Sequence, residues 1–269
     1  MGRFLAYLVF LAALALGAAW YSHSSAGLRL QFSSPESTAV QTDDHWLDDL
    51  YSQNPRDVQE AEARVTRDGE RALPALRAAL TSTAGDRQRR KAALKACVLL
   101  ERKAVPIMAE VAAQLRDPDL TEEAAVALSF MGPTAFAPLR HALSSHDPVL
   151  RREAIRSLGK LKARAPLDAR TVTPLLLTAM RDEEPTVRAV AATYLGIIHE
   201  HPAESIPALV AGLDDSEIEV RRASATALGS FGEAAEPALP ALRKAAGDRD
   251  PDLAREAGRS LIRLLPPRR

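Results

Sequence analysis

The chain has 269 residues, of which 46% are hydrophobic and 26% charged, as is typical of a folded protein rather than a disordered one. Lys and Arg together number 35, as do Asp and Glu, so a polybasic nucleic-acid arm or an acidic tail does not dominate the chain. The single cysteine, Cys97, excludes an intramolecular disulfide framework and a cysteine-rich zinc site.

Residues 4–21 form an uncharged, mostly apolar run that follows Arg3. As a helix the run would be about 27 Å long, close to the roughly 30 Å hydrocarbon core of a bilayer. The run predicts a transmembrane signal anchor over residues 1–21, with the remaining chain extracytoplasmic (periplasmic if bacterial) in a single-pass protein. A cleaved signal peptide is the alternative, which would leave a secreted protein.

Residues 22–42 are rich in Ser, Thr and Gln and lack helical periodicity, so we expect a flexible linker there. Residues 43–69 contain two helical stretches, 46–51 and 56–66, with a large polar face. Such a face is typical of the terminal cap of a repeat array, and we therefore predict a helical N-terminal cap.

A proline next to apolar residues recurs along the rest of the chain at spacings of 32, 32, 36, 33 and 33 residues. The recurring prolines are Pro74, Pro106, Pro138, Pro174, Pro207 and Pro240. Proline suits the first turn of a helix, where its missing N–H would have no partner. The spacing predicts that each proline opens the first helix of a repeating helix pair.

A second pattern, apolar-Arg-x-x-Ala-x-x-x-Leu-Gly, follows each proline, most clearly from Val187 to Gly196 and from Leu150 to Gly159. Apolar residues at positions 0, +4 and +8 line one face of a second helix, and Gly at +9 predicts a helix C-cap. An acidic turn precedes each second helix and predicts capping by Asp. The turn acids are Asp86, Asp117, Asp147, Asp182, the pair Asp214 and Asp215, and Asp248.

These six helix pairs resemble HEAT repeats, especially the short HEAT-like type found in phycobilisome lyases. The resemblance covers about residues 70–265 and implies an all-α, right-handed α-solenoid of about six helix pairs with an armadillo-type fold. Residues 266–269 would be a C-terminal tail. Only 4% of the residues are aromatic, and most of these precede residue 52, so the repeat core must consist of Ala, Leu, Val and Ile.

The motifs of this chain favour a binding protein over an enzyme. Cys97 falls in the Leu slot of its repeat, where a buried, small apolar residue is expected. His199, Glu200 and His201 supply one His-Glu dyad, whereas HEAT-fold metal hydroxylases use several. We therefore predict no catalytic, metal or cofactor-binding residue and no small-molecule substrate. A HEAT-fold enzyme or enzyme accessory protein, bilin-lyase-like or metal-hydroxylase-like, is the alternative function.

By the same resemblance, slots +2 and +6 of the second helices face the concave side of the solenoid. Seven of the twelve residues in these slots are basic: Lys91, Lys95, Arg152, Arg156, Arg222, Arg255 and Arg259. The hypothesis is a scaffold or adaptor, membrane-tethered or exported, whose basic stripe binds a protein partner with an acidic segment. The alternative is a solvated face whose arginines pair with the +3 acids Glu123, Glu153 and Glu256.

The arginines at slot +1, which are Arg151, Arg188 and Arg221, are expected to pair with the turn acids. Nucleic acid is disfavoured as a partner, because the net charge is zero and aromatic residues for base stacking are nearly absent. The neutral total conceals a basic centre, since residues 86–180 contain 16 basic and 10 acidic residues.

Overall fold

Helices make up all the regular secondary structure in the part of the chain that the computed structural model describes, namely residues 45–82, 86–164, 167 and 169–264. No strand occurs among these residues, which confirms the prediction of an all-α protein. The described residues belong to one unit that extends from Asp43 to Arg269.

Two helices, α2 (Trp46–Asp49) and α3 (Pro55–Asp68), precede the repeats and pack against α5 (Arg87–Leu100). Asn54 begins α3, because its side-chain oxygen accepts a hydrogen bond from the Arg56 amide at 3.1 Å. Trp46 and Leu47 of α2 are buried in the core. The division of the chain into a cap at 43–69 and repeats at 70–265 stays a prediction.

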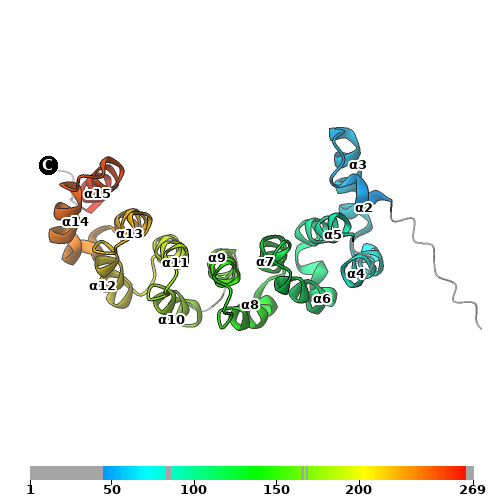
Figure 1. Ribbon diagram of the computed structural model, residues 1–269, viewed down its shortest axis with the longest axis horizontal. Coiled ribbons are helices and arrows are strands. Elements are labelled where there is room, and N and C mark those ends of the chain that lie inside the picture. Colours follow the sequence, from blue (N-terminus) through cyan, green and yellow to red (C-terminus); the bar gives the residue numbers. More distant parts are fainter. Residues whose placement is uncertain (1–44, 83–85, 165–166, 168, 265–269) are drawn as a thin grey trace, which may run out of the picture. The chain divides into compact units, whose positions relative to one another are not determined.

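Six helix pairs follow within the described residues. They are α4 (Leu73–Thr81) with α5, α6 (Met108–Ala113) with α7 (Thr121–Phe130), α8 (Phe136–Ala142) with α9 (Pro148–Arg164), α10 (Ala169–Ala179) with α11 (Pro185–Ile198), α12 (Pro202–Gly212) with α13 (Ile218–Ser230), and α14 (Leu239–Ala246) with α15 (Pro251–Leu264). Within this unit the second helix of each pair lies on the inner side of the arc, and the first helix lies on the outer side (Figure 1).

The core of this array consists mainly of Ala, Leu, Val and Ile, as the composition predicts. Among the described residues, Trp46 and Phe231 are the only aromatic side chains in the buried core. Ala154, Ala191 and Ala257, at the +4 slots, are completely buried. Small side chains in these slots let neighbouring helices approach closely, which gives the core dispersion contacts without large rings.

The glycines at slot +9 serve helix packing rather than helix termination, contrary to the prediction. Gly196 lies inside α11, which continues to Ile198, and a Cβ there would lie 2.6 Å from the Cα of Ala227 on α13. Gly229 makes a similarly close approach to Ser260 on α15. Glycine is therefore required because a Cβ at these positions would overlap the next second helix, at the backbone of Ala227 or at the side chain of Ser260.

The prolines differ in their positions within the first helices. Pro74 and Pro240 occupy the first turns of α4 and α14, as predicted. Pro174 and Pro207 instead lie inside α10 and α12, because the preceding residues form an additional turn of helix. Each interior proline removes one backbone hydrogen bond from its helix.

The prediction of a single-pass membrane protein is corrected. Among the residues that the structure describes, no helix combines the length and the apolarity that crossing a bilayer requires. Residues 4–21, from which the sequence predicts the anchor, lie outside the described residues, as do the predicted linker 22–42 and tail 266–269. The membrane localisation is not retained.

The packing at Gly196 predicts that Gly196→Ala destabilises the array. The added Cβ must displace the α13 backbone at Ala227, so we expect the free energy of unfolding to fall by about 1–3 kcal/mol. Gly258→Ala on α15 is the matched control, since a Cβ there meets no atom within 4 Å. We expect this control to raise the free energy of unfolding by about 0.5–1 kcal/mol. Urea unfolding followed by circular dichroism measures both, and equal effects would contradict the packing role.

Candidate binding face of the helical array

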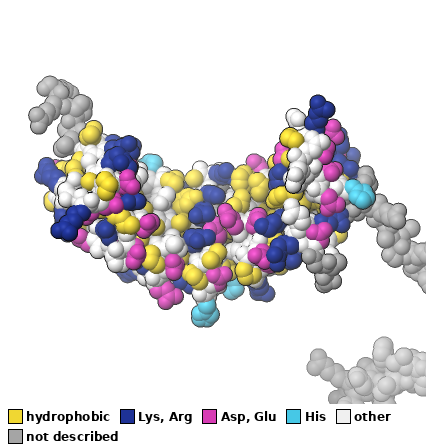
Figure 2. Space-filling model, turned by 45° about the horizontal axis from the view of Figure 1, so that its top comes forward, with side chains coloured by type: hydrophobic (Ala, Val, Ile, Leu, Met, Phe, Trp, Pro, Cys, Tyr) yellow, Lys and Arg dark blue, Asp and Glu magenta, His cyan; other side chains and the backbone are white. Residues whose placement is uncertain are grey.

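The seven predicted basic residues lie on four of the second helices in separate groups. Lys91 and Lys95 belong to α5, Arg152 and Arg156 to α9, Arg222 to α13, and Arg255 and Arg259 to α15. The intervening helices α7 and α11 contribute Glu122, Val126, Ala189 and Thr193 at the same slots. Figure 2 shows basic, acidic and apolar side chains intermingled over the middle of the array, so the face does not form one continuous basic stripe.

The two α5 lysines hold neighbouring helices together. Lys91 Nζ lies 2.7 Å from Glu123 Oε1 on α7, and this hydrogen bond raises the pKa of Lys91. Lys95 Nζ lies 3.0 Å from Glu62 Oε1 on α3 and donates to the Leu50 carbonyl oxygen at 3.1 Å. Each lysine thus has a carboxylate partner on an adjacent element.

The C-terminal group is also balanced by acids. Arg222 donates to both carboxylate oxygens of Asp250, at 3.0 and 2.6 Å, and these bonds lower the pKa of Asp250 to about 2. Arg255 pairs with Asp252, and Arg259 NH1 lies 2.8 Å from Glu256 Oε1.

The two α9 arginines differ from the others because they share one buried carboxylate. Arg152 Nε donates to Glu153 Oε1 at 2.9 Å, and Arg156 NH1 donates to Glu153 Oε2 at 3.1 Å. Glu153 is fully buried, whereas the arginine side chains are 29% and 33% exposed. The next carboxylate, Glu122 on α7, lies 4.0 Å from Arg156 and is 67% exposed, so water screens it strongly. Within hydrogen-bonding distance the two guanidinium groups therefore share a single carboxylate.

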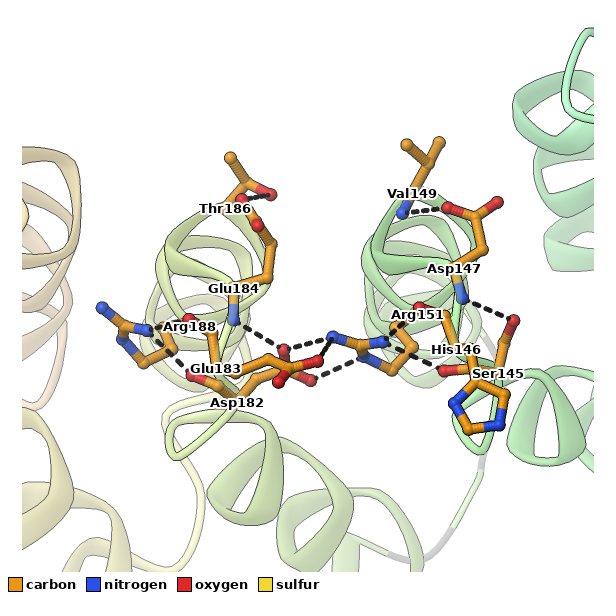
Figure 3. A network of polar contacts seen from close by, with 10 residues as sticks. All are labelled: Ser145, His146, Asp147, Val149, Arg151, Asp182, Glu183, Glu184, Thr186 and Arg188. Atoms are coloured by element: carbon orange, nitrogen blue, oxygen red, sulfur yellow. Dashed lines mark hydrogen bonds and ion pairs between the residues drawn. The ribbon is translucent and has the colours of Figure 1, made fainter.

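Two of the slot +1 arginines, Arg151 and Arg188, form a ladder along the array, and Figure 3 shows its contact between Arg151 and Asp182. Arg151 donates to Asp182 Oδ1 and Oδ2, at 2.8 and 2.9 Å, and to the carbonyl oxygens of Ser145 and His146. Arg188 makes the equivalent bidentate contact with Asp215, at 2.8 Å for both bonds. Each arginine thus joins its own inter-helix turn to the turn of the next repeat.

The ladder changes the acidity of its aspartates. Burial raises the pKa of Asp182, but hydrogen bonds from Arg151 and from the Glu184 amide outweigh burial, so the pKa lies below its usual value. The hydrogen bond from Arg188 lowers the pKa of Asp215. The predicted pairing with turn acids is confirmed for Arg151 and Arg188.

Arg221 departs from this pattern. It donates to the carbonyl oxygens of Asp215 and Ser216 in its own turn, both at 2.8 Å. The contact with the next turn is made by its neighbour Arg222, which pairs with Asp250. Sequence spacing alone does not distinguish these two adjacent arginines.

Two further basic residues of α9 lie outside the set predicted from the sequence. Lys160 and Arg164 continue the row of Arg152 and Arg156 at steps of four residues. Slot +6 of this helix is Arg156, whereas α9 extends two further turns to Arg164. The four-residue spacing itself is visible in the sequence and would have identified both residues.

The residues considered for chemistry occupy structural positions. Burial raises the pKa of the Cys97 thiol to about 12, which opposes formation of a reactive thiolate. His199 and His201 have left-handed backbone conformations, and Glu200 pairs with Lys162 at 3.2 Å. In the described part of the chain, no group of three or more metal-ligating side chains occurs.

Comparison with known proteins agrees with this geometry. A family model described as HEAT repeats matches residues 172–262. The fold is a HEAT-type α-solenoid. The archaeal HEAT-like repeats protein from Thermococcus onnurineus NA1 is 15% identical, with a TM-score of 0.54, and the match covers 82% of this chain and 96% of that chain. No curated protein matches the chain.

Two further solved structures have lower TM-scores. A designed armadillo repeat protein is 18% identical over 82% of this chain and 99% of that chain, with a TM-score of 0.41. The complex of CpcE and CpcF of phycocyanin lyase from Nostoc sp. PCC7120 is 21% identical over 58% of this chain and 98% of that chain, with a TM-score of 0.48. These likenesses assign no activity to the present protein.

The ladder predicts a loss of stability in Arg188→Gln. The bidentate pair with Asp215 is only 14% exposed on both sides, so we expect the free energy of unfolding to fall by about 2–3 kcal/mol at neutral pH. Lys244→Gln is the control, because its ion pair with Asp214 is 77% and 67% exposed and contributes about 0–1 kcal/mol.

The same variant predicts a pH dependence. The pKa of Asp215 is lowered in the folded state, so the stabilisation is complete above the unfolded pKa of about 3.9 and is lost as the pH falls through the folded value. Urea unfolding at several pH values should show wild type and Arg188→Gln converging in acid. A constant difference down to the lowest measurable pH would contradict the assignment.

The burial of Cys97 predicts an unreactive thiol in the folded protein. Because the side chain is fully buried, a chromogenic disulfide reagent at mildly alkaline pH should modify it only when urea unfolds the array. Prompt stoichiometric modification of the folded protein would show that Cys97 is accessible.

Proposed function

We propose that this protein is a HEAT-repeat scaffold that binds an acidic segment of a protein partner on its second-helix face, centred on α9. The observation that supports this proposal is the arrangement of Arg152 and Arg156 around the buried carboxylate of Glu153. One carboxylate orients two guanidinium groups and neutralises only one of their charges.

Each arginine uses one N–H group for Glu153, Arg152 its Nε and Arg156 its NH1. The remaining N–H groups are available for an external acceptor, and guanidinium groups recognise carboxylates in a planar, bidentate geometry. Because Glu153 already restrains both side chains, less conformational entropy is lost on binding than for unrestrained arginines. The site is therefore pre-organised for an anionic partner.

The flanking helices leave room for such a partner. Val126 on α7 and Ala189 and Thr193 on α11, at the same slots, have short side chains that are at least partly exposed. The other basic residues of the predicted stripe each have a carboxylate of their own, so we place them at the margin of the site. A HEAT-fold enzyme or enzyme accessory protein stays a prediction, because it depends on likeness of fold alone.

The test compares two triple variants in matching slots. The first combines Arg152→Gln, Glu153→Gln and Arg156→Gln, which avoids leaving Glu153 charged and unpaired in the core. The control combines Arg255→Gln, Glu256→Gln and Arg259→Gln on α15, where the same three residue types occupy the same slots. Both variants remove two positive charges and one negative charge.

Fluorescence anisotropy with a labelled glutamate-rich peptide at physiological salt measures the binding. We expect the α9 variant to weaken binding by about tenfold or more, equivalent to about 1.4 kcal/mol, and the α15 control to change it much less. Thermal unfolding followed by circular dichroism establishes that both variants fold. Equal weakening by both would indicate non-specific charge attraction, and absence of binding by the wild type would overturn the proposal.

A further inference from the structure

The basic residues of α9 form a row longer than the pair around Glu153. Arg152, Arg156, Lys160 and Arg164 follow one another at four-residue steps. Each step advances about 6 Å along the helix and turns about 40° around it, so the row is inclined across α9. The row inclines toward α7, because the guanidinium carbon of its last residue, Arg164, lies 3.7 Å from the centroid of the Phe130 ring on α7.

The far half of this row carries charge that the described residues do not neutralise. Among them, no hydrogen bond or ion pair joins Lys160 or Arg164 to another side chain, apart from the stacking of Arg164 on Phe130. Stacking on an aromatic ring restrains a guanidinium and leaves its N–H edge available for an acceptor in its own plane.

The row ends at a cavity of about 570 Å³ between the C-terminal ends of α5, α7 and α9. Arg102 and Arg164 both line it, and Glu101 contributes one carboxylate. Arg102 crosses Gly132, whose φ is +85°, and its Nε lies 3.1 Å from the position that a Cβ at Gly132 would occupy. Within the described residues Arg102 has no ion pair, so the cavity contains two cations and one acid.

The spacing between successive basic residues of this row is close to the spacing between alternate side chains of an extended peptide. Side chains on one face of an extended chain recur every second residue, at about 6.6–6.8 Å, against about 6 Å for the row. Over three steps the two lengths are about 20 Å and about 18 Å, a difference that the long Arg and Lys side chains can absorb.

We propose that the partner segment is extended, has acidic residues at alternate positions, and lies along the α9 row with its last carboxylate in the cavity between Arg102 and Arg164. This inference rests on the proposed function and specifies its ligand. A helical partner would be about 10–12 Å across, whereas an extended chain is narrower and can follow the inclined row toward Phe130.

The experiment compares three labelled peptides of equal length and equal charge at physiological salt. One has Glu at every second position, one has the same glutamates in a single block, and one has them at every fourth position in an alanine-rich helix. Each peptide is titrated into three proteins. They are the wild type, a cavity variant that combines Arg102→Gln and Arg164→Gln, and a control variant that combines Arg116→Gln and Arg140→Gln. The control removes two arginines from the first-helix side of the array, one of which lies over the Phe136 ring.

The alternating peptide should bind about tenfold more tightly than the other two, and the cavity variant should remove most of this preference while the control retains it. Equal affinity for all three peptides, with binding still sensitive to the α9 triple variant, would overturn the inference and leave the proposed function standing. Tighter binding of the helical peptide would also overturn the extended geometry. Absence of binding by every peptide would overturn both.

Discussion

The backbone contact between successive second helices is the constraint on which this solenoid depends. Gly196 brings the backbone of α11 against Ala227 of α13, and Gly229 brings α13 against Ser260 of α15. Buried Ala side chains such as Ala154, Ala191 and Ala257 fill the neighbouring core slots, and Gly159 on α9 makes room for the Tyr194 ring of α11. The helix axes are therefore near enough for side chains on one second helix to reach the next, as Arg188 reaches Asp215.

Because the second helices lie this close together, arginines on the same helix have two different roles that depend on their slot. At slot +1 the guanidinium lies at the junction of two turns, where backbone carbonyls and the next aspartate use its N–H groups. At slots +2 and +6 the basic side chains pair with a carboxylate of their own helix, as Arg152 does with Glu153, or of another helix, as Lys91 does with Glu123. The ladder contributes to the alignment of the repeats, and the inner-face arginines remain the candidates for binding.

The centre of the array differs from its ends because α9 combines three properties. Two arginines share one buried carboxylate, the helix extends to Arg164, and its last cation stacks on a ring of the preceding repeat. Within the basic centre at residues 86–180, four of the basic residues form one inclined row with a cavity at its end. The α5 and α13–α15 groups contain comparable basic residues, but carboxylates such as Glu123 and Asp250 already occupy them.

The sequence by itself determined the helix pairs, their period and the apolar character of the core, because amphipathic periodicity and residue size are local properties of the chain. It also indicated the roles of Arg151, Arg188 and Cys97. Only the tertiary structure decided that the slot +9 glycines let successive second helices approach closely rather than ending them, since that role depends on Ala227 and Ser260 in the following repeat. It likewise decided which basic residues have partners, because Glu62 and Asp250 reach Lys95 and Arg222 across 33 and 28 positions of the chain, and only folding brings such distant charges within 3 Å.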